Sequence, residues 1–161
     1  MYFDDHGEPA RVVGIVVDIT ARKFLEITAQ SALERLNEAQ RISGIGDWDW
    51  DGTSGKITWS RQVFMIMGRD PDLGTPNEPD DLRAYYDAAS LVVQQQHIAA
   101  AIATGEKQVF ELVVVRSGGE LRFARAMALP RTDAAGTVVA LYGTIEDITE
   151  RKRVDFETAR L

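Results

Sequence analysis

The second half of the chain alternates between hydrophobic and polar positions in a pattern that predicts three β-strands. These strands cover residues 108–116, 120–129 and 137–146. Glycine-containing turns at residues 117–119 and 133–136 separate them. Because the connections are short, consecutive strands are expected to pair as an antiparallel meander.

A hairpin rich in tryptophan is predicted ahead of these strands. Residues 46–51 read Gly-Asp-Trp-Asp-Trp-Asp, with Gly and both Trp on one face and the three Asp on the other. Turn-forming residues 51–55 lead to a second short strand at 56–59, which closes the hairpin. One face is therefore expected to be buried. Acids at every second position of a strand usually form a solvated face, so no metal site is expected there.

Three shorter helices are predicted between the hairpin and the meander. Ser60 is expected to cap the first of them, which Gly68 ends. The second covers about residues 80–87, and the third is capped by Ser90 and runs to Thr104. The order of strand pair, helices and three strands predicts an α+β domain, with the helices on one face of a five-stranded antiparallel sheet.

A long N-terminal helix is predicted from Thr20 to about residue 42. Five of its small or apolar residues are spaced by four, three, four and three positions, which is typical of a narrow coiled-coil seam. An ordinary amphipathic helix packed on its own domain fits the same spacing, and both interpretations stay open. The seam residues are the candidates for a homodimer contact: Leu25, Ala29, Ala32, Leu36 and Ala39.

The phrase Asp-Ile-Thr followed by a basic pair occurs twice, at residues 18–23 and 147–152. The same offset superposes Gly14 on Gly143, which indicates a repeated unit. Each copy is predicted to be a strand, a cap and a helix.

The first of these strands should cover residues 12–17, and the second lies within 138–145. Thr20 and Thr149 are the expected N-cap residues.

Composition limits the functions that the chain can have. There is no Cys, which excludes disulfides, thiolate metal sites and cysteine nucleophiles. A formal net charge of −7 argues against a general nucleic-acid surface, because phosphate binding requires clustered Lys and Arg. No hydrophobic run reaches the length of a membrane span, so we expect a cytoplasmic fragment without direct membrane insertion.

The order of the predicted elements agrees with a set of short phrases at residues 44–51, 55–60, 103–106, 116–120 and 143–152. In these features the chain resembles, over residues 37–152, a PAS domain with a C-terminal PAC motif. Residues 1–23 resemble the PAC end of a preceding PAS domain. Many members of this subgroup have His-Pro-Asp-Asp where this chain has Asp87-Ala88-Ala89-Ser90.

This resemblance implies a sensory and dimerisation module of a bacterial signalling protein, commonly a histidine kinase or a diguanylate cyclase. The expected organisation is an upstream PAS tail (1–23), a dimerisation helix (24–43), the PAS domain (44–149) and the start of an output helix (150–161). Signal transfer is expected at the two Asp-Ile-Thr phrases, although a plain helix cap explains the same residues. The four positions are Asp18, Thr20, Asp147 and Thr149.

Two functions remain open at this stage, with the first favoured. The domain is either a relay and dimerisation module without a bound ligand, or a sensor of a small apolar molecule in the core. The expected partners are a second copy and the adjacent PAS and output domains. The candidate pocket residues would equally fill a closed core: Phe64, Met67, Tyr85, His97, Ile98, Ile102, Leu112, Phe123, Met127 and Tyr142.

Enzymatic and cofactor chemistry finds little support in the sequence. The cysteinyl flavin adduct of some PAS domains is excluded, because there is no Cys. His97 lies on the helix that carries the ligand in heme-binding relatives, but a lone His among apolar residues more often has a structural role. Gly118-Gly119-Glu120 is similar to the signature of diguanylate cyclases, yet its surroundings favour a hairpin turn. No complete catalytic set is present, so we do not expect this fragment to be an enzyme.

Overall fold

The computed structural model describes residues 2–76 and 79–160. The chain divides into two compact units, Met1–Arg35 and Leu36–Leu161, which are considered separately. Strands β1 (Tyr2–Phe3) and β2 (Pro9–Arg11) form a small antiparallel hairpin in the first unit. The Asp4 carboxylate accepts hydrogen bonds from two backbone N–H groups of the connecting turn.

The strand predicted at residues 12–17 is wrong. These residues carry no strand assignment, and their apolar side chains are exposed, with Val16 99% accessible. A strand needs a neighbour to pair its backbone groups. The second copy of the repeat has two such neighbours, whereas no strand pairs with residues 12–17 within the described part of the chain.

Helix α1 (Thr20–Ser43) confirms the predicted long helix. Only Asn37 and Gln40 are partly shielded, and its other residues are exposed. The exposed side chains include large apolar ones, among them Phe24, Leu25, Ile27 and Leu36.

The second unit is built on one five-stranded antiparallel sheet, as the sequence predicted. The sheet order is β4-β3-β7-β6-β5. Its strands are β3 (Ile45–Asp51), β4 (Ile57–Trp59), β5 (Gln108–Val115), β6 (Leu121–Thr132) and β7 (Val138–Asp147).

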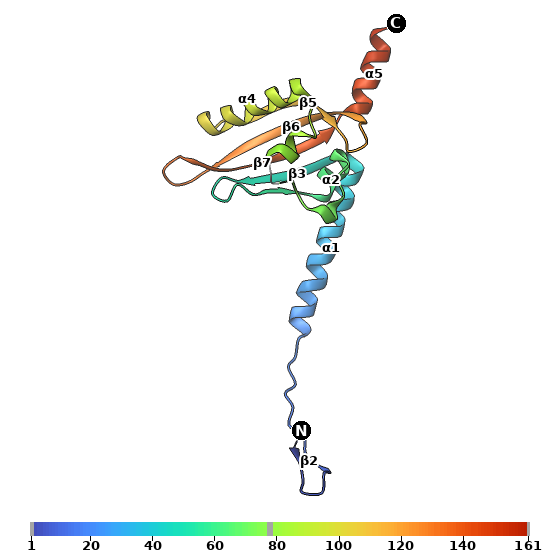
Figure 1. The fold of residues 1–161 in the computed structure, drawn as a ribbon, viewed down its shortest axis with the longest axis vertical. Coiled ribbons are helices and arrows are strands. Elements are labelled where there is room, and N and C mark those ends of the chain that lie inside the picture. Colours follow the sequence, from blue (N-terminus) through green and yellow to red (C-terminus); the bar gives the residue numbers. More distant parts are fainter. Residues whose placement is uncertain (1, 77–78, 161) are drawn as a thin grey trace. The chain divides into compact units, whose positions relative to one another are not determined.

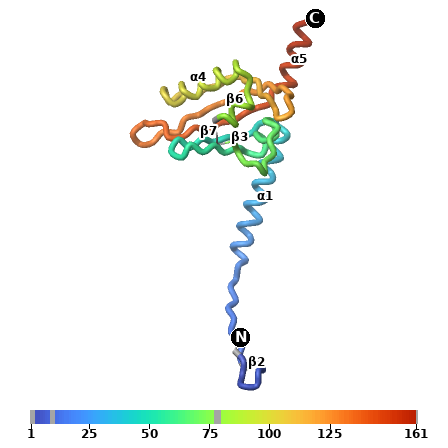
Figure 2. The backbone as a smooth tube through the Cα atoms, in the orientation of Figure 1, coloured from blue at the N-terminus to red at the C-terminus, as the bar shows by residue number. Residues whose placement is uncertain are grey.

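The helices connect the two edges of this sheet. They are α2 (Arg61–Met67), the 3₁₀ helix η1 (Pro71–Leu73), α3 (Pro79–Arg83) and α4 (Ala88–Thr104). The chain thus passes from edge strand β4 to edge strand β5, as the trace in Figure 2 shows. In Figure 1, α4 lies along β5 and β6, on which it packs, and α5 (Thr149–Ala159) leaves the end of β7.

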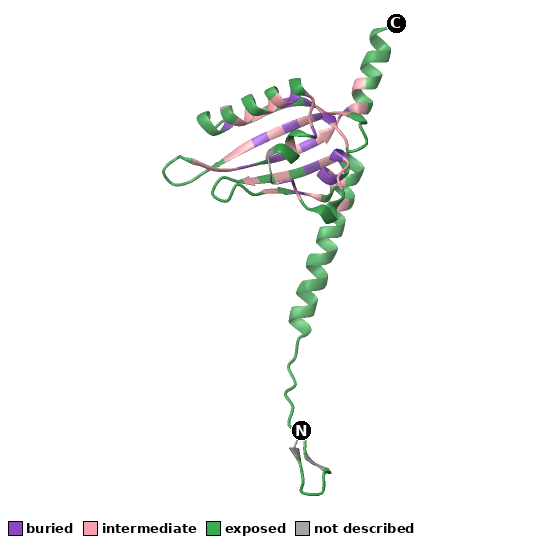
Figure 3. Cartoon of the chain, viewed as in Figure 1, coloured by how far each residue is buried: buried purple, intermediate pink, exposed green. Residues whose placement is uncertain are grey.

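The core lies between the sheet and the helices. Figure 3 shows the buried positions concentrated on α2 and on alternate residues of the strands. The hairpin prediction is confirmed, because the Asp residues of β3 are exposed while Gly46 is buried. Trp48 pairs with Trp59 on one side and with Gly143 on the other, so all three share the inner face.

Two predicted helix starts need correction. The second short helix ends at Arg83, and the Asp87 side chain caps α4 by accepting a hydrogen bond from the Ser90 N–H at 2.7 Å. Ser90 therefore lies inside α4, and its hydroxyl accepts from the Val113 N–H at 2.7 Å. Ser60 does occupy the N-cap position of α2, but its hydroxyl accepts from the Asp47 N–H in β3. Both hydroxyls fasten a helix to the sheet.

Candidate functional site

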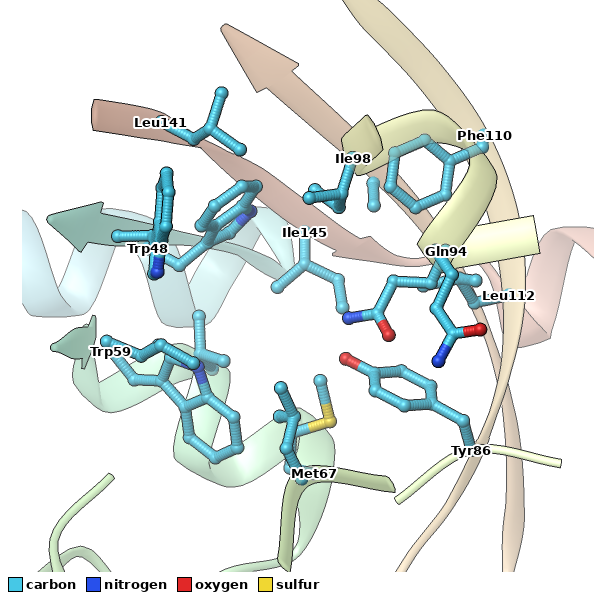
Figure 4. Close-up of a pocket in the computed structure, with 16 residues that line it drawn as sticks. Trp48, Trp59, Met67, Tyr86, Gln94, Ile98, Phe110, Leu112, Leu141 and Ile145 are labelled. Atoms are coloured by element: carbon cyan, nitrogen blue, oxygen red, sulfur yellow. The ribbon is translucent and has the colours of Figure 1, made fainter. Parts of the chain in front are cut away.

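A cavity of about 270 Å³ lies between the sheet and the helices. Its walls are largely apolar and include several aromatic side chains, and the sticks in Figure 4 show the lining residues arranged around it. Every tryptophan of the chain is among them. The aromatic lining residues are Trp48, Trp50, Trp59, Tyr86 and Phe110.

Small residues on the inner face of β6 leave room for this cavity. Ala124, Ala126 and Ala128 are buried and alternate with larger side chains that point to the other face. Ala126 itself lines the cavity. Aliphatic side chains complete the walls: Ile57, Val63, Met67, Leu82, Ile98, Leu112, Leu141 and Ile145.

Gly143 fixes the spacing of the central strands. A Cβ atom at this position would collide with the carbonyl oxygen of Met127 in β6 and would crowd the Trp48 ring. The Trp48 indole instead lies over the strand and donates its Nε1–H to the Thr144 carbonyl at 3.3 Å. The requirement for glycine is therefore one of space rather than of backbone conformation.

Three polar side chains also face the cavity. They are the hydroxyl of Tyr86 and the amides of Gln94 and Gln95. In Figure 4 the Tyr86 hydroxyl points into the cavity toward Met67 and Ile145. Burial raises the pKa of Tyr86, so the hydroxyl stays protonated and is able to donate a hydrogen bond.

A second candidate site is the junction between β7 and α5. Ile148, in the middle of the Asp-Ile-Thr phrase, is only 2% exposed. Its N–H donates to the Phe123 carbonyl at 2.8 Å, and the Thr149 hydroxyl accepts from the Phe123 N–H at 2.9 Å. Both backbone groups of one β6 residue are thus paired with the junction.

The roles of Asp and Thr in this phrase differ from the prediction. Thr149 is the first residue of α5, and its own N–H donates to the Asp147 carboxylate at 2.9 Å. The first copy shows the same pattern, with the Thr20 N–H donating to Asp18 at 2.9 Å. Hydrogen bonding from Thr20, chiefly from its side chain and secondarily from its backbone N–H, holds the pKa of Asp18 below its usual value. The aspartate therefore supplies the capping oxygen in both copies, so the prediction that the two threonines are N-caps is wrong.

Charged side chains tie the first turns of α5 to the sheet. Lys152 Nζ lies 2.6 Å from a carboxylate oxygen of Glu111 on β5. Arg125 of β6 reaches the same carboxylate at 3.4 Å. Hydrogen bonding from Lys152, and secondarily from Arg125, holds the pKa of Glu111 below its usual value.

The structure brings only some of the predicted pocket residues together. Met67, Ile98 and Leu112 line the cavity. Phe64 and Tyr85 are buried in the neighbouring core, where each packs edge-on against Trp59. The lining residues that sequence reasoning missed include all three tryptophans, Tyr86 and both glutamines.

Phe123, Met127 and Tyr142 belong to the opposite face of the sheet, so the structure contradicts their placement in the pocket. All three are large residues on strands of the predicted meander, but residue size does not determine which face of the sheet a side chain occupies. Along β6 the alanines occupy the inward positions and the large residues the outward ones. Gly46, Trp48 and Trp50 alternate with exposed Asp residues and so mark the inner face of β3. Extending this alternation through the strand pairing to β7 and β6 identifies the correct face.

Two further predicted residues of α4 also lie away from the cavity walls. Ile102 is 40% exposed. The His97 ring stacks on Phe110 with centroids 4.7 Å apart, and its Nδ1 lies 2.9 Å from Gln108 Oε1. One ring nitrogen of His97 is thus hydrogen-bonded within the domain, and the ring itself is packed against a core residue.

Neither a metal centre nor a membrane span is found in the described ranges. Residues 2–76 and 79–160 contain no group of three or more His, Cys, Asp or Glu side chains placed to hold a metal ion. Over the same residues, no helix is both long and apolar enough to cross a membrane.

This geometry defines the class of protein. It is an antiparallel α+β domain with a cavity in its core and an exit helix that is hydrogen-bonded to its sheet. Residues 84–153 match the family model of the PAS fold. This part of the chain is a PAS domain, as the sequence resemblance had indicated.

Comparison with characterised proteins links the chain to sensor kinases. It is 31% identical over 143 residues to a blue-light-activated histidine kinase of Brucella ovis, covering 86% of this chain and 27% of that protein. The corresponding kinase of Brucella anthropi is 29% identical over 171 residues, with 96% and 33% covered. The chain therefore spans about a third or less of the length of these relatives.

Solved structures show the same fold. A sensory box histidine kinase/response regulator from Burkholderia thailandensis superposes with a TM-score of 0.62 at 24% identity, covering 78% of this chain and 92% of that one. The N-terminal domain of a diguanylate cyclase with a PAS/PAC sensor from Marinobacter aquaeolei gives 0.60 at 15% identity, with 67% and 98% covered. At this level of identity the likeness concerns the fold alone.

Proposed function

We propose that this PAS domain is a sensory and relay module of a multidomain bacterial signalling protein, most simply a sensor histidine kinase. In this proposal the signal passes from β7 to α5 through Asp147, Ile148 and Thr149. The observation that carries it is the double pairing of Phe123 with this junction, which leaves little slack between sheet and helix. A shift of β7 against β6 would therefore change where α5 begins.

Residues that line the cavity lie close in sequence to the residues of this junction. Ile145 lines the cavity and lies two residues before Asp147 on β7. On β6, Ala126 lines the cavity and Phe123 binds the junction. Packing changes inside the domain thus reach both strands that hold the start of α5.

The same proposal includes a homodimer formed through α1. Among the described residues, the seam side chains Leu25 and Leu36 are 67% and 52% exposed. This face of α1 is therefore available to pack against a second copy of the chain. Residues 24–43 would be the dimerisation helix, residues 44–149 the sensor domain and residues 150–161 the start of an output helix. Residues 1–23 would end an upstream PAS domain, whose remaining strands would pair with residues 12–17. The proposed partners are these adjacent domains, and the proposed location is cytoplasmic.

A conservative core substitution tests the relay. Ile145→Val removes one methylene group beside the cavity and should raise the hydrogen-exchange rate of the amides in the first two turns of α5. Ile66→Val is the matched control, because Ile66 is equally buried but belongs to α2. Equal exchange in α5 of the two variants would contradict the relay.

The cavity supports a second candidate function, the sensing of a small molecule. A packed core of side chains leaves few voids larger than a water molecule. A volume of about 270 Å³ is far larger than that, and it approaches the lower end of ligand pockets. The relatives are named for activation by blue light. A covalent flavin–cysteine adduct is excluded in this chain, which contains no Cys.

A further inference from the structure

We propose that the cavity binds an uncharged molecule with an aromatic body and a single hydrogen-bonding group, which Tyr86, Gln94 and Gln95 recognise. This inference rests on the second function proposed above, the sensing of a small molecule. It assigns the chemical class of the ligand and the residues that select it.

The size and walls of the cavity define the body of the ligand. A cavity of about 150 Å³ engineered into another protein accepts benzene. The present volume of about 270 Å³ therefore suits a substituted aromatic ring. Trp48 and Trp59 supply aromatic surfaces from the β3–β4 side and Phe110 supplies one from β5. Aromatic side chains stack with a ring more favourably than their buried area alone accounts for.

The polar group of the ligand follows from the polar side chains on the cavity wall. Within the described residues, the Tyr86 hydroxyl and the amides of Gln94 and Gln95 have no hydrogen-bond partner in the protein, and Gln95 is also exposed to solvent. A phenol donates and accepts, and an amide does both at separate atoms. The complementary group is one that also donates and accepts, such as a primary amide or a hydroxyl.

The absence of charge on the walls determines the charge of the ligand. Among the described residues that line the cavity, none carries a side chain that is charged at neutral pH. An ion moved from water into such surroundings loses its hydration without gaining a counterion. Carboxylates and ammonium groups should therefore be rejected.

Gln95 indicates where the ligand enters. It lines the cavity and is also exposed to solvent, whereas Gln94, on the same helix, is half-buried. The polar end of the cavity is thus the end that opens at α4. A ligand that enters there would place its ring between the tryptophans and its polar group at the mouth.

The test compares three probes of similar shape, which are benzamide, toluene and benzoate. Binding to the purified chain at pH 7 is followed by the indole N–H signals of the three tryptophans in ¹H–¹⁵N spectra and by calorimetry. Benzamide should bind at least fivefold more tightly than toluene and at least tenfold more tightly than benzoate. Tyr86→Phe should weaken benzamide at least fivefold and leave toluene unchanged.

Tyr85→Phe is the matched control variant. It removes the hydroxyl of the adjacent tyrosine, which accepts a hydrogen bond from Arg69 and does not line the cavity. Its affinity for benzamide should equal that of the unmodified chain.

The outcomes separate this inference from the function on which it rests. Equal affinities for benzamide and toluene would overturn the polar recognition while leaving small-molecule sensing in place. Tightest binding of benzoate would overturn the selection for uncharged ligands. Failure of all three probes to shift any tryptophan signal would overturn both the inference and the sensing function.

Discussion

Lys152 on the exit helix and Glu111 on edge strand β5 form an ion pair with an N–O distance of 2.6 Å. The two residues belong to elements that are separated in sequence by two strands. The pair thus fastens the helix to the sheet beside the bonds made by Thr149. Exposed pairs of this kind contribute about 0.2–1 kcal/mol.

Lys152→Met should loosen the start of α5 and lower the free energy of unfolding by about 0.2–1 kcal/mol. Arg153→Met is the control, because Arg153 pairs with Glu150 inside the same helix and not with the sheet. A double-mutant cycle with Glu111→Gln, followed by urea unfolding, measures the coupling. A coupling energy of zero would show that the pair does not hold the helix.

The same pair makes a pH-dependent contribution to stability. The folded pKa of Glu111 lies below its unfolded value, chiefly because of the hydrogen bond from Lys152. The stabilisation is therefore complete above the unfolded pKa of about 4.3 and is lost as the pH falls through the folded pKa. The difference in unfolding free energy between the unmodified chain and Glu111→Gln should be present at pH 7 and should shrink toward zero at low pH. A difference that grows with acidity would contradict this assignment.

Thr149→Val should destabilise the domain by about 1–3 kcal/mol, because it leaves the half-buried N–H of Phe123 without its acceptor. Valine keeps the shape of the side chain, so the change isolates the hydrogen bond. Thr149→Ser retains the hydroxyl and should cost much less. Equal losses for the two variants in urea unfolding would mean that the methyl group, not the hydroxyl, matters.

Gly143→Ala should be among the most damaging single substitutions, with a loss of about 3 kcal/mol, because the new methyl group collides with the β6 backbone. Gly118→Ala is the control, since no atom lies within 4 Å of its added Cβ. Thermal unfolding of both variants measures the difference. A mild effect at Gly143 would show that β6 and β7 separate easily.

Leu36→Asp should shift the chain from dimer to monomer, because it places a charge in the proposed seam of α1. Ile27→Asp is the matched control: Ile27 is 65% exposed and lies on the opposite face of the helix. Light-scattering mass measurements should show a monomer only for the first variant. An unchanged dimer in Leu36→Asp would place the interface elsewhere.

The sequence was sufficient to predict the five strands, the long helix and the fold class. Alternation with a period of two is a local property, and the turns at Gly118 and Gly136 delimit the strands. The strand expected at residues 12–17 failed for a reason that is not local. Its composition is as β-prone as that of β7, but strand formation depends on neighbours, which residues 12–17 lack in the described structure.

The candidate site was harder to predict, because residue type does not state direction. Met127 is more hydrophobic and larger than Ala126, yet the alanine faces the cavity. The hydroxyls of Ser60, Ser90 and Thr149 were expected to cap their own helices. Each instead accepts from the backbone of a strand that is distant in sequence. Only the folded arrangement decides between a local and a long-range acceptor role.

The row of alanines on β6 allows the volume of the cavity to be changed by single substitutions. Exchanging Ala126 for a larger aliphatic residue would shrink the interior in graded steps, and none of the hydrogen bonds that hold α5 would be touched. Under the proposed sensing function, related domains would differ in the ligand they accept through the residue at position 126 and would keep the same hydrogen bonds between β6 and α5. The size of the ligand would then be selected, by evolution or by engineering, at a residue whose own side chain takes no part in the hydrogen bonds at the start of α5.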